Sequence, residues 1–484
     1  MKSGLPVSHS FHHAGWLQLS CNAKCSVKRI AVLLSIIGVS VISACASLPN
    51  VSDDSQKVAS PVLGNGRRLN EATASHVIQN ISGAATSEAR TEVDKLADAV
   101  RRETRSPFLL GNKVRVLVDG PETFAHIRQH IDRAHSSIHV ETYIFADDKL
   151  GQDFAGLLAE KARQGVEVRV IFDALGSATS ASEMFERMRQ AGVQVEAFHP
   201  LTPLRTLPWR YNNRDHRKLL VIDGKVAFTG GLNISSTYSS GSVLRPGPER
   251  GMDEGWRDTH AQIEGPAVRM FQALFFETWV GLGGQVANDS GKYFPMLAEI
   301  GTDIVSAVAS TGVKQRDEAI YTSYLAAIDN ASRRIWITQA YFSPPEDLRD
   351  ALIAAVRRGV DVRILLPGFT DSTLVFHAAR AGYTKLLEGG VRLFEVTDAL
   401  LHAKTALIDN SLSVIGSANL DYRSFLHNNE ITAVIISESL AERMQQIFLA
   451  DSMKSREISL KDWRKRPFKD RIKESFSRLF NYWL

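Results

Sequence analysis

The 484-residue sequence has few cysteines, no excess of one charge and no long apolar segment. Three cysteines cannot build a disulfide framework, and no Cys-x-x-Cys pair or Cys/His cluster has the spacing of a zinc site. The 57 Lys+Arg residues barely exceed the 53 Asp+Glu residues, which argues against a basic coat for non-specific binding of nucleic acid. The longest apolar run, residues 30–42, would form a helix of about 20 Å, too short for the roughly 30 Å bilayer core.

The composition is otherwise that of a globular protein. Hydrophobic residues make up 44% of the chain and charged residues 23%, which excludes a wholly disordered chain. The length exceeds that of one average core and therefore predicts two or more domains.

The N-terminus has the pattern of a secretory signal, which we assign to residues 1–44. Lys28 and Arg29 precede the short apolar run, and small residues follow it up to Cys45. The sequence Ile-Ser-Ala-Cys at 42–45 resembles a bacterial lipobox, which would make Cys45 the lipidated first residue of the mature chain. The alternative is a membrane-lodged anchor with an incidental cysteine.

We expect a polar linker from Cys45 to about residue 70 and a helix over residues 71–103, together forming a segment over 45–104.

The chain then repeats itself, with similar segments recurring about 195 residues later. The matching pairs of segments are 137–145 with 334–342, 162–170 with 356–364, and 191–195 with 389–393. In each copy, β-branched runs of strand length alternate with amphipathic helical patterns that end at glycine. This pattern predicts an α/β fold of two similar βαβ sandwich halves, residues 105–290 and 291–450, packed about a pseudo-two-fold axis.

Each half carries the same constellation of polar residues. Counted from a histidine, lysine follows at position +2, aspartate at +7, glycine at +14 and asparagine at +17 in both copies. The members are His216, Lys218, Asp223, Gly230 and Asn233 in the first half, and His402, Lys404, Asp409, Gly416 and Asn419 in the second. We expect each histidine and lysine to share one face of a strand, because side chains two positions apart point the same way. A tight turn at Asp223 or Asp409 would bring the glycine and asparagine back beside them.

These residues suit transfer of a phosphoryl group. Two imidazoles supply a nucleophile and a general acid without a metal ion. Two lysines and two carboxamides, with backbone N–H groups at the glycines, hold the charge of the phosphoryl group in transit. A solvated lysine and a core histidine would explain one copy of the pattern, but not two copies at identical spacing.

The motifs resemble the HKD motifs of the phospholipase D superfamily, and the surrounding sequence resembles bacterial cardiolipin synthases. The resemblance extends over about residues 107–450 and rests on the following segments: RDHRK at 214–218, VAFTGGLNI at 226–234, WRDTH at 256–260, SANLDYRSF at 417–425, and Asn429 with Glu430.

The resemblance implies a two-step transfer through a phosphatidyl-histidine. One histidine, usually that of the first half, attacks the lipid phosphodiester, and the other exchanges protons with the leaving and incoming alcohols. Asp258 and Glu430 occupy the positions of acidic residues that hold the histidines, so that a carboxylate on one ring nitrogen fixes the tautomer.

The remaining motif residues have supporting roles. Asp223 and Asp409 are expected to be structural, holding the turn after the strand. Four further residues are expected at the phosphate: Gly230, Gly231, Gly416 and Ser417. We expect no metal ion and no cofactor, since the phosphate is served by His, Lys and Asn rather than by a carboxylate cluster.

The resemblance implies a phosphatidyltransferase that makes cardiolipin from phosphatidylglycerol, with phosphatidylethanolamine as a further possible substrate. The alternatives are a phospholipase D that releases phosphatidic acid and a phosphodiesterase acting on nucleic acid. The lipobox and the modest net charge argue against nucleic acid as a partner, and no obligate protein partner is indicated. We expect the protein on the periplasmic side of a bacterial cell envelope, and Ala46 after the cysteine favours the outer membrane over the inner one.

Three further segments bear on membrane contact. Residues 236–251 are rich in Ser, Gly, Pro and Arg, and form either a mobile flap or an idle insertion. Trp209, Arg210 and Tyr211 suit lipid headgroups or a stacked nucleic acid. The segment 451–484 is a basic amphipathic helix, attracted to anionic lipid or packed on the body with its basic residues outward.

Overall fold

The computed structural model describes residues 58–201, 212–239, 255–286, 290–312, 318–370, 372–480 and 482. The signal segment with Cys45, the aromatic-basic motif at 209–211 and residues 240–251 of the expected flap lie outside them. All described residues belong to one compact unit. Within it, no helix has both the length and the apolar character needed to cross a membrane.

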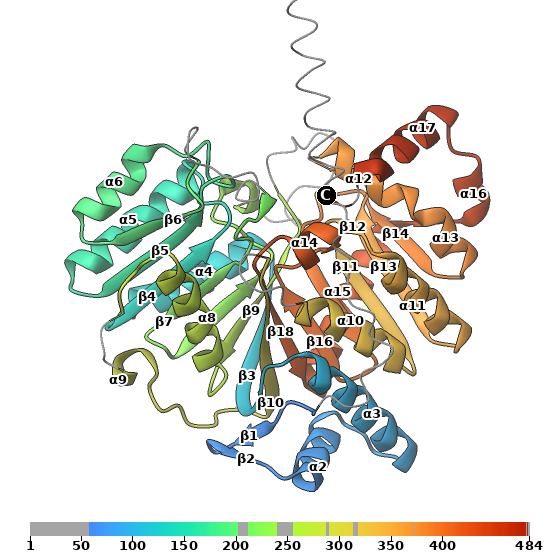
Figure 1. Cartoon of the computed structure of the whole chain (residues 1–484), viewed down its shortest axis with the longest axis horizontal. Helices are drawn as coiled ribbons and strands as arrows, with labels where there is room; N and C mark the ends of the chain where they lie inside the picture. Colours follow the sequence, from blue (N-terminus) through green and yellow to red (C-terminus); the bar gives the residue numbers. More distant parts are fainter. Residues whose placement is uncertain are drawn as a thin grey trace, which may run out of the picture. The chain divides into compact units, whose positions relative to one another are not determined.

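Two sheets with the same strand order form the frame (Figure 1). In the first half the order is β6–β5–β4–β7–β8–β9–β3, and in the second it is β14–β13–β11–β15–β16–β18–β10. The first-half strands are β3 (Phe108–Val118), β4 (Ser137–Thr142), β5 (Glu167–Asp173), β6 (Gln194–Phe198), β7 (Leu219–Ile222), β8 (Val226–Gly230) and β9 (Thr259–Glu264). The second-half strands are β10 (Asp303–Ser310), β11 (Arg334–Gln339), β13 (Asp361–Pro367), β14 (Arg392–Val396), β15 (Lys404–Ile408), β16 (Leu412–Gly416) and β18 (Glu430–Ile436). The predicted α/β fold with two similar halves is confirmed.

The halves are joined along their inner edges, where β3 pairs antiparallel with β10. In each half three parallel strands are followed by an antiparallel hairpin that contains the motif aspartate, for example β7 and β8 around Asp223. Apolar side chains from both sheets share one core cluster, as Leu219 and Val221 do with Leu407 and Ile415. The halves therefore bury a common interface instead of standing as independent domains.

Helices cover both sheets. The first-half helices are α4 (Asp119–Asp132), α5 (Lys149–Arg163), α6 (Ser182–Gln190) and α8 (Val268–Gly281). The second-half helices are α10 (Ala319–Asn330), α11 (Glu346–Arg357), α12 (Thr373–Ala381), α13 (Tyr383–Glu388) and α15 (Glu438–Met453). The repeated glycines end α5 and α11, because Gly165 and Gly359 adopt φ values of 89° and 92° that side chains disfavour. Each chain then enters a buried parallel strand, β5 or β13.

The N-terminal segment is more structured than the sequence suggested. Strands β1 (Val62–Gly64) and β2 (Arg67–Arg68) lie inside the stretch predicted as linker, and β1 pairs parallel with β3. The buried side chain of Val62 attaches this hairpin to the body. The predicted single helix is two helices, α2 (Glu71–Ile81) and α3 (Ser87–Glu103), each capped by a side chain, Asn70 or Thr86.

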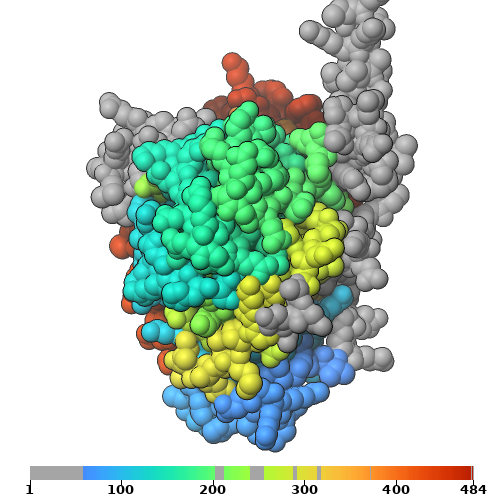
Figure 2. Space-filling model, turned by 90° about the vertical axis from the view of Figure 1, so that its left-hand side faces the viewer, coloured from blue at the N-terminus to red at the C-terminus, as the bar shows by residue number. Residues whose placement is uncertain are grey.

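The C-terminal segment follows α15 and returns to the second half. Strand β19 (Ser455–Ile458) pairs antiparallel with the edge strand β14, and the helices α16 (Leu460–Arg464), α17 (Phe468–Ser477) and η3 (Arg478–Phe480) complete the chain. In the side view, the N-terminal helices in blue and the C-terminal segment in dark red lie at opposite ends of this unit (Figure 2).

Candidate active site

The two motif histidines lie directly before the hairpin strands, and each is bonded through its backbone to the other half. His216 N–H donates to the carbonyl of Asn429 at 2.9 Å, and His402 N–H donates to the carbonyl of Arg257 at 2.8 Å. Asn429 and Arg257 are the residues directly before the acids Glu430 and Asp258. The backbone therefore brings each histidine to the acid of the opposite half.

The side chains complete this exchange. Nδ1 of His216 lies 3.0 Å from both carboxylate oxygens of Glu430, and Nδ1 of His402 lies 2.8 Å from Oδ2 of Asp258. All four side chains are buried. With Nδ1 bound to a carboxylate, Nε2 is the nitrogen of each ring left for chemistry, and the imidazolium is stabilised.

The two motif lysines are buried beside the histidines. Lys218 Nζ donates to the carbonyl of His216 at 2.8 Å. Lys404 Nζ donates to the carbonyl of His402 and lies 3.0 Å from its Nδ1. Among the causes that lower the pKa of Lys218 is the charge of Lys404, so the two ammonium groups act on the same region. This pairing of buried cations suits an anionic ligand.

The motif glycines permit close packing around the acids. A Cβ atom on Gly231 would lie 2.1 Å from a carboxylate oxygen of Asp258, so no larger residue fits without moving that acid. At the equivalent position Ser417 donates from Oγ to Glu430 Oε2 at 2.6 Å. A Cβ on Gly230 or Gly416 would collide with the neighbouring strand, at Thr259 or Thr432. All four residues expected at the phosphate thus border the acids or their strands.

The two motif asparagines differ in their surroundings. Asn233 is engaged within its own half: Oδ1 accepts from Ile144 N–H at 3.2 Å and Nδ2 donates to the Tyr238 hydroxyl at 3.2 Å. Asn419 is buried, and its Oδ1 has no hydrogen-bond partner within the described part of the chain. The Asn419 side chain is therefore less engaged within the described residues than that of Asn233, with a buried acceptor left over.

The motif aspartates lie at the far end of the hairpins. Asp223 accepts from the N–H groups of residues 135, 136 and 137, which lead into β4, and Asp409 accepts from those of residues 332, 333 and 334, which lead into β11. Both adopt a φ of 52° at the turn. Each aspartate therefore ties its hairpin to the neighbouring parallel strand, away from the histidines.

The structure adds aromatic residues to the site that the repeat did not identify. The Tyr238 hydroxyl lies 3.2 Å from His402 Nδ1, and the Trp256 ring centroid lies 5.2 Å from that of His402. Tyr143 packs edge-on to His216 at 5.0 Å, with Lys218 Nζ 5.3 Å from its ring centre. Tyr238 lies in the segment read as a flap, and its counterpart in the second half is Ser424, so internal comparison gave no signal for it.

Burial sets the protonation of the site. It lowers the pKa of Lys218 to about 7, with Glu430 opposing the shift, and it lowers the pKa of His216. Burial raises the pKa of Asp258 to about 6 against the charge of Lys404. Burial alone would raise the pKa of Glu430, but His216, Lys218 and Ser417 hold it below its usual value. Near neutral pH both acids are ionised, and Lys218 lies close to its midpoint.

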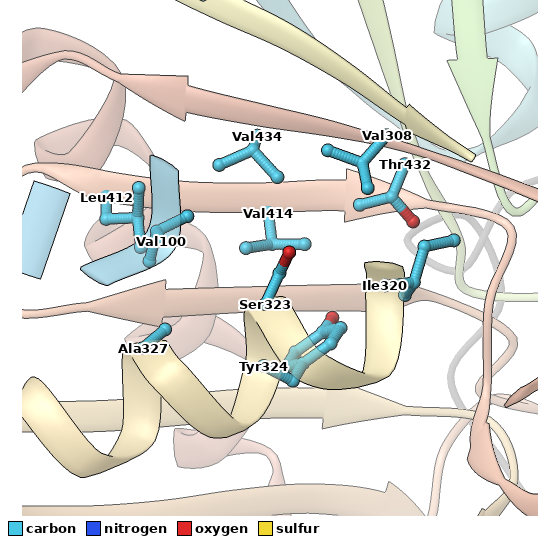
Figure 3. Close-up of a pocket in the computed structure, with 10 residues that line it drawn as sticks. All are labelled: Val100, Val308, Ile320, Ser323, Tyr324, Ala327, Leu412, Val414, Thr432 and Val434. Carbon is cyan, nitrogen blue, oxygen red and sulfur yellow. The ribbon is translucent and has the colours of Figure 1, made fainter. Parts of the chain in front are cut away.

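Within the described ranges no group of three His, Cys, Asp or Glu residues could hold a metal ion. The apolar cavity in Figure 3, between α10 and the second sheet, is lined by Val308, Tyr324, Val414 and similar residues. Its volume of about 10 Å³ suits at most one water molecule.

Comparison with known proteins agrees with this geometry. A family described as "Cardiolipin synthase, PLD-like domain" matches residues 127–241 and 324–452, which contain both motifs. A cardiolipin synthase of Geobacillus kaustophilus is 39% identical over 78% of this chain and 73% of its own length. One of Halalkalibacterium halodurans is 36% identical over 78% and 74%.

The fold recurs in a solved structure. The crystal structure of phosphatidylserine synthase from Haemophilus influenzae superposes with a TM-score of 0.62 at 14% identity, covering 81% of this chain and all of that one. At this identity the likeness concerns the fold alone. Two copies of the motif, the matching family and relatives of this identity and coverage lead to one assignment: the chain belongs to the cardiolipin synthase family of phospholipase D-like enzymes.

Proposed function

We propose that this chain is a phosphatidyltransferase that joins two phosphatidylglycerol molecules into cardiolipin and releases glycerol. The observation that supports the proposal is the exchange of acids between the halves: each buried motif histidine contacts a carboxylate of the opposite half, beside a buried lysine. The relatives named as cardiolipin synthases support this substrate class.

In the proposed first step, Nε2 of His216 attacks the phosphorus of one phosphatidylglycerol. The N–P bond forms as the bond from phosphorus to the headgroup glycerol oxygen breaks, and His402 gives its proton to that oxygen. Glu430 stabilises the positive charge on the His216 ring through Nδ1. Lys218, Lys404 and the amide of Asn419 offset the charge on the phosphoryl oxygens.

In the second step, His402 takes a proton from a headgroup hydroxyl of a second phosphatidylglycerol. The oxygen attacks phosphorus, the N–P bond breaks, and both histidines return to their starting protonation states. Asp258 supports His402 through Nδ1 during both proton transfers. The same steps with water as acceptor would yield phosphatidic acid.

The test is to incubate the purified protein with phosphatidylglycerol, with and without phosphatidylethanolamine, and to identify the products by mass. Cardiolipin with equimolar glycerol is the expected result, and it should persist in EDTA because His, Lys and Asn serve the phosphate. Phosphatidic acid as the only product would identify a hydrolase instead. Cleavage of DNA without lipid turnover, or activity that returns from EDTA only with a divalent ion, would refute the proposal.

We also propose that Cys45 carries a lipid anchor on the periplasmic side of the cell envelope, in the outer membrane rather than the inner one. The lipobox sequence at 42–45 supports this placement. Labelled fatty acid should enter the natural protein and not the Cys45→Ser variant, which should be soluble or unprocessed. Equal labelling of both proteins would refute the anchor.

A further inference from the structure

The helix α17 is attached to the body by a polar face. It packs on α12, and its buried residues are Glu474 and Ser477. Glu474 is ion-paired with Arg466 at 2.8 Å, while Asp470, one turn earlier on the same face, is half-buried. A helix on the surface of a water-soluble protein normally buries its apolar stripe instead.

The outward face of α17 and η3 is apolar. Phe468, Ile472, Phe476 and Leu479 follow one another at helical spacing, with exposed fractions of 70%, 53%, 58% and 75%. We call these four residues the α17 stripe. From the sequence, this segment was expected either to be attracted to anionic lipid or to pack on the body with its basic residues outward. The helix does pack on the body, but it leaves apolar as well as basic residues exposed.

Exposed basic residues flank the stripe. Lys469 and Arg471 alternate with it along the helix, followed by Lys473 and Arg478. Large apolar side chains mixed with bases at one surface match the boundary between acyl chains and anionic headgroups. A partner protein with an acidic apolar groove would also fit, but the proposed substrate of this enzyme is itself an anionic lipid.

The stripe lies at the active-site end of the second half. Helix α12, on which α17 packs, lines a small apolar groove together with Tyr341, whose ring lies 6.3 Å from that of His402. Figure 1 shows α17 and α12 at the same end as β12 (Phe342–Ser343), which follows β11, and α14 (Tyr422–Leu426), which follows the motif strand β16. Further exposed apolar residues are Leu374 of α12, which follows β13, and Leu175, which follows β5.

We propose that the α17 stripe docks on a bilayer containing anionic phospholipid, with its four apolar side chains at the acyl boundary and the flanking bases on headgroup phosphates. Docking would present the two histidines to lipid in the plane of the membrane. The proposal rests on the proposed function for the identity of the lipid, but its binding test does not require turnover.

The first test is hydrogen–deuterium exchange of the full chain with phosphatidylglycerol vesicles, compared with phosphatidylcholine vesicles. Residues 468–480 should exchange at least tenfold more slowly on phosphatidylglycerol, and the effect should weaken as salt is raised. Absence of protection there, whether or not the N-terminus holds the chain on the vesicle, would overturn the proposal. Protection without vesicles that disappears on dilution would identify a second copy of the chain as the occupant and would equally overturn it.

The second test compares two sets of variants. One set replaces the stripe residues Phe468, Ile472 and Leu479 with Gln, and its control replaces the exposed Val280, Met296 and Ile300 with Gln. Stripe variants should lose at least tenfold in turnover on vesicles and keep their turnover in detergent micelles, whereas the control should match the natural protein in both. Equal turnover of stripe and control variants on vesicles would refute docking by the stripe.

Charge is tested in the same way. Lys469→Glu with Arg471→Glu should weaken binding to phosphatidylglycerol vesicles severalfold, and Arg67→Glu with Arg68→Glu, exposed at the other end, should not. Equal binding by the two double variants would show that the bases flanking the α17 stripe do not contribute to docking. Protection of residues 468–480 in a protein that makes no cardiolipin would refute the proposed function and leave the docking surface supported.

Discussion

Nδ1 of His216 lies 3.0 Å from both carboxylate oxygens of Glu430, a residue 214 positions later in the chain. His402 and Asp258 are paired in the reverse sense. Each half thus supplies the histidine of one pair and the acid of the other, and this exchange leads to the first prediction.

Replacing the acids should affect the two steps differently. Glu430→Gln should lower turnover about 10³-fold and slow formation of a covalent adduct on His216, because the developing imidazolium loses its carboxylate. Asp258→Asn should lower turnover similarly, yet a substrate with a good leaving group should still form the adduct, which then persists. Quench-flow mass spectrometry measures both quantities. Ser417→Ala, which removes one hydrogen bond to Glu430, should cost only about tenfold.

The histidines should act as a unit. His216→Ala, His402→Ala and the double variant should all fall to a similar floor, about 10⁴-fold or more below the natural protein. The His402→Ala protein should accumulate lipid on His216 from an activated substrate, and the His216→Ala protein should form no adduct. Peptide mapping of the adduct to His402 would reverse the assigned roles, and near-normal turnover of either single variant would exclude a shared site.

The pH dependence of kcat/KM should be bell-shaped. Activity requires Asp258 ionised, which is lost as pH falls through about 6, and Lys218 charged, which is lost as pH rises through about 7. The optimum should lie between these values, and Lys218→Arg should move the basic limb to higher pH because a guanidinium stays charged. A basic limb unchanged in that variant would assign it to another group.

Tyr238 should act as a positioning residue. Tyr238→Phe removes the hydroxyl that contacts Asn233 Nδ2 and His402 Nδ1, and should lower kcat about five- to tenfold with KM within twofold. Tyr321→Phe is the matched control, since the buried Tyr321 hydroxyl has no hydrogen-bond partner among the described residues. Equal effects of the two variants on kcat would show that Tyr238 only fills space.

The internal repeat was sufficient to predict the α/β fold, because alternation and glycine-ended helices are local properties of each copy. It could also place His216 beside Lys218, which are two positions apart on one chain segment. It could not show from spacing which acid meets which histidine, since that depends on how the two halves pack. The association of Asp258 and Glu430 with the histidines came from the family resemblance alone.

Other features had no local signal. The counterpart of Tyr238 in the repeat is a serine, Ser424. The β1–β2 hairpin consists of a few residues in a polar stretch, and its pairing with β3 is a contact between distant parts of the chain. The amphipathic pattern of 468–480 was visible in the sequence. In the structure, however, the polar face of the helix is buried and the apolar face is exposed, the reverse of the usual arrangement. The covered face carries Glu474, which is ion-paired with Arg466 outside the helix, and the spacing of the apolar residues gives no sign of that contact.

The antiparallel pairing of β3 with β10, together with the shared apolar core, also fixes the position of each histidine relative to the acid of the other half. A shift of one sheet against the other by a single ångström would lengthen both histidine–carboxylate contacts at once, although each half would keep its own strands and helices. Enzyme activity should therefore disappear at a lower denaturant concentration than the far-ultraviolet circular dichroism signal. Insertions that each half tolerates elsewhere should not be tolerated between β3 and β10. The contact between the two halves is therefore constrained in evolution as the subunit interface of an obligate dimer is.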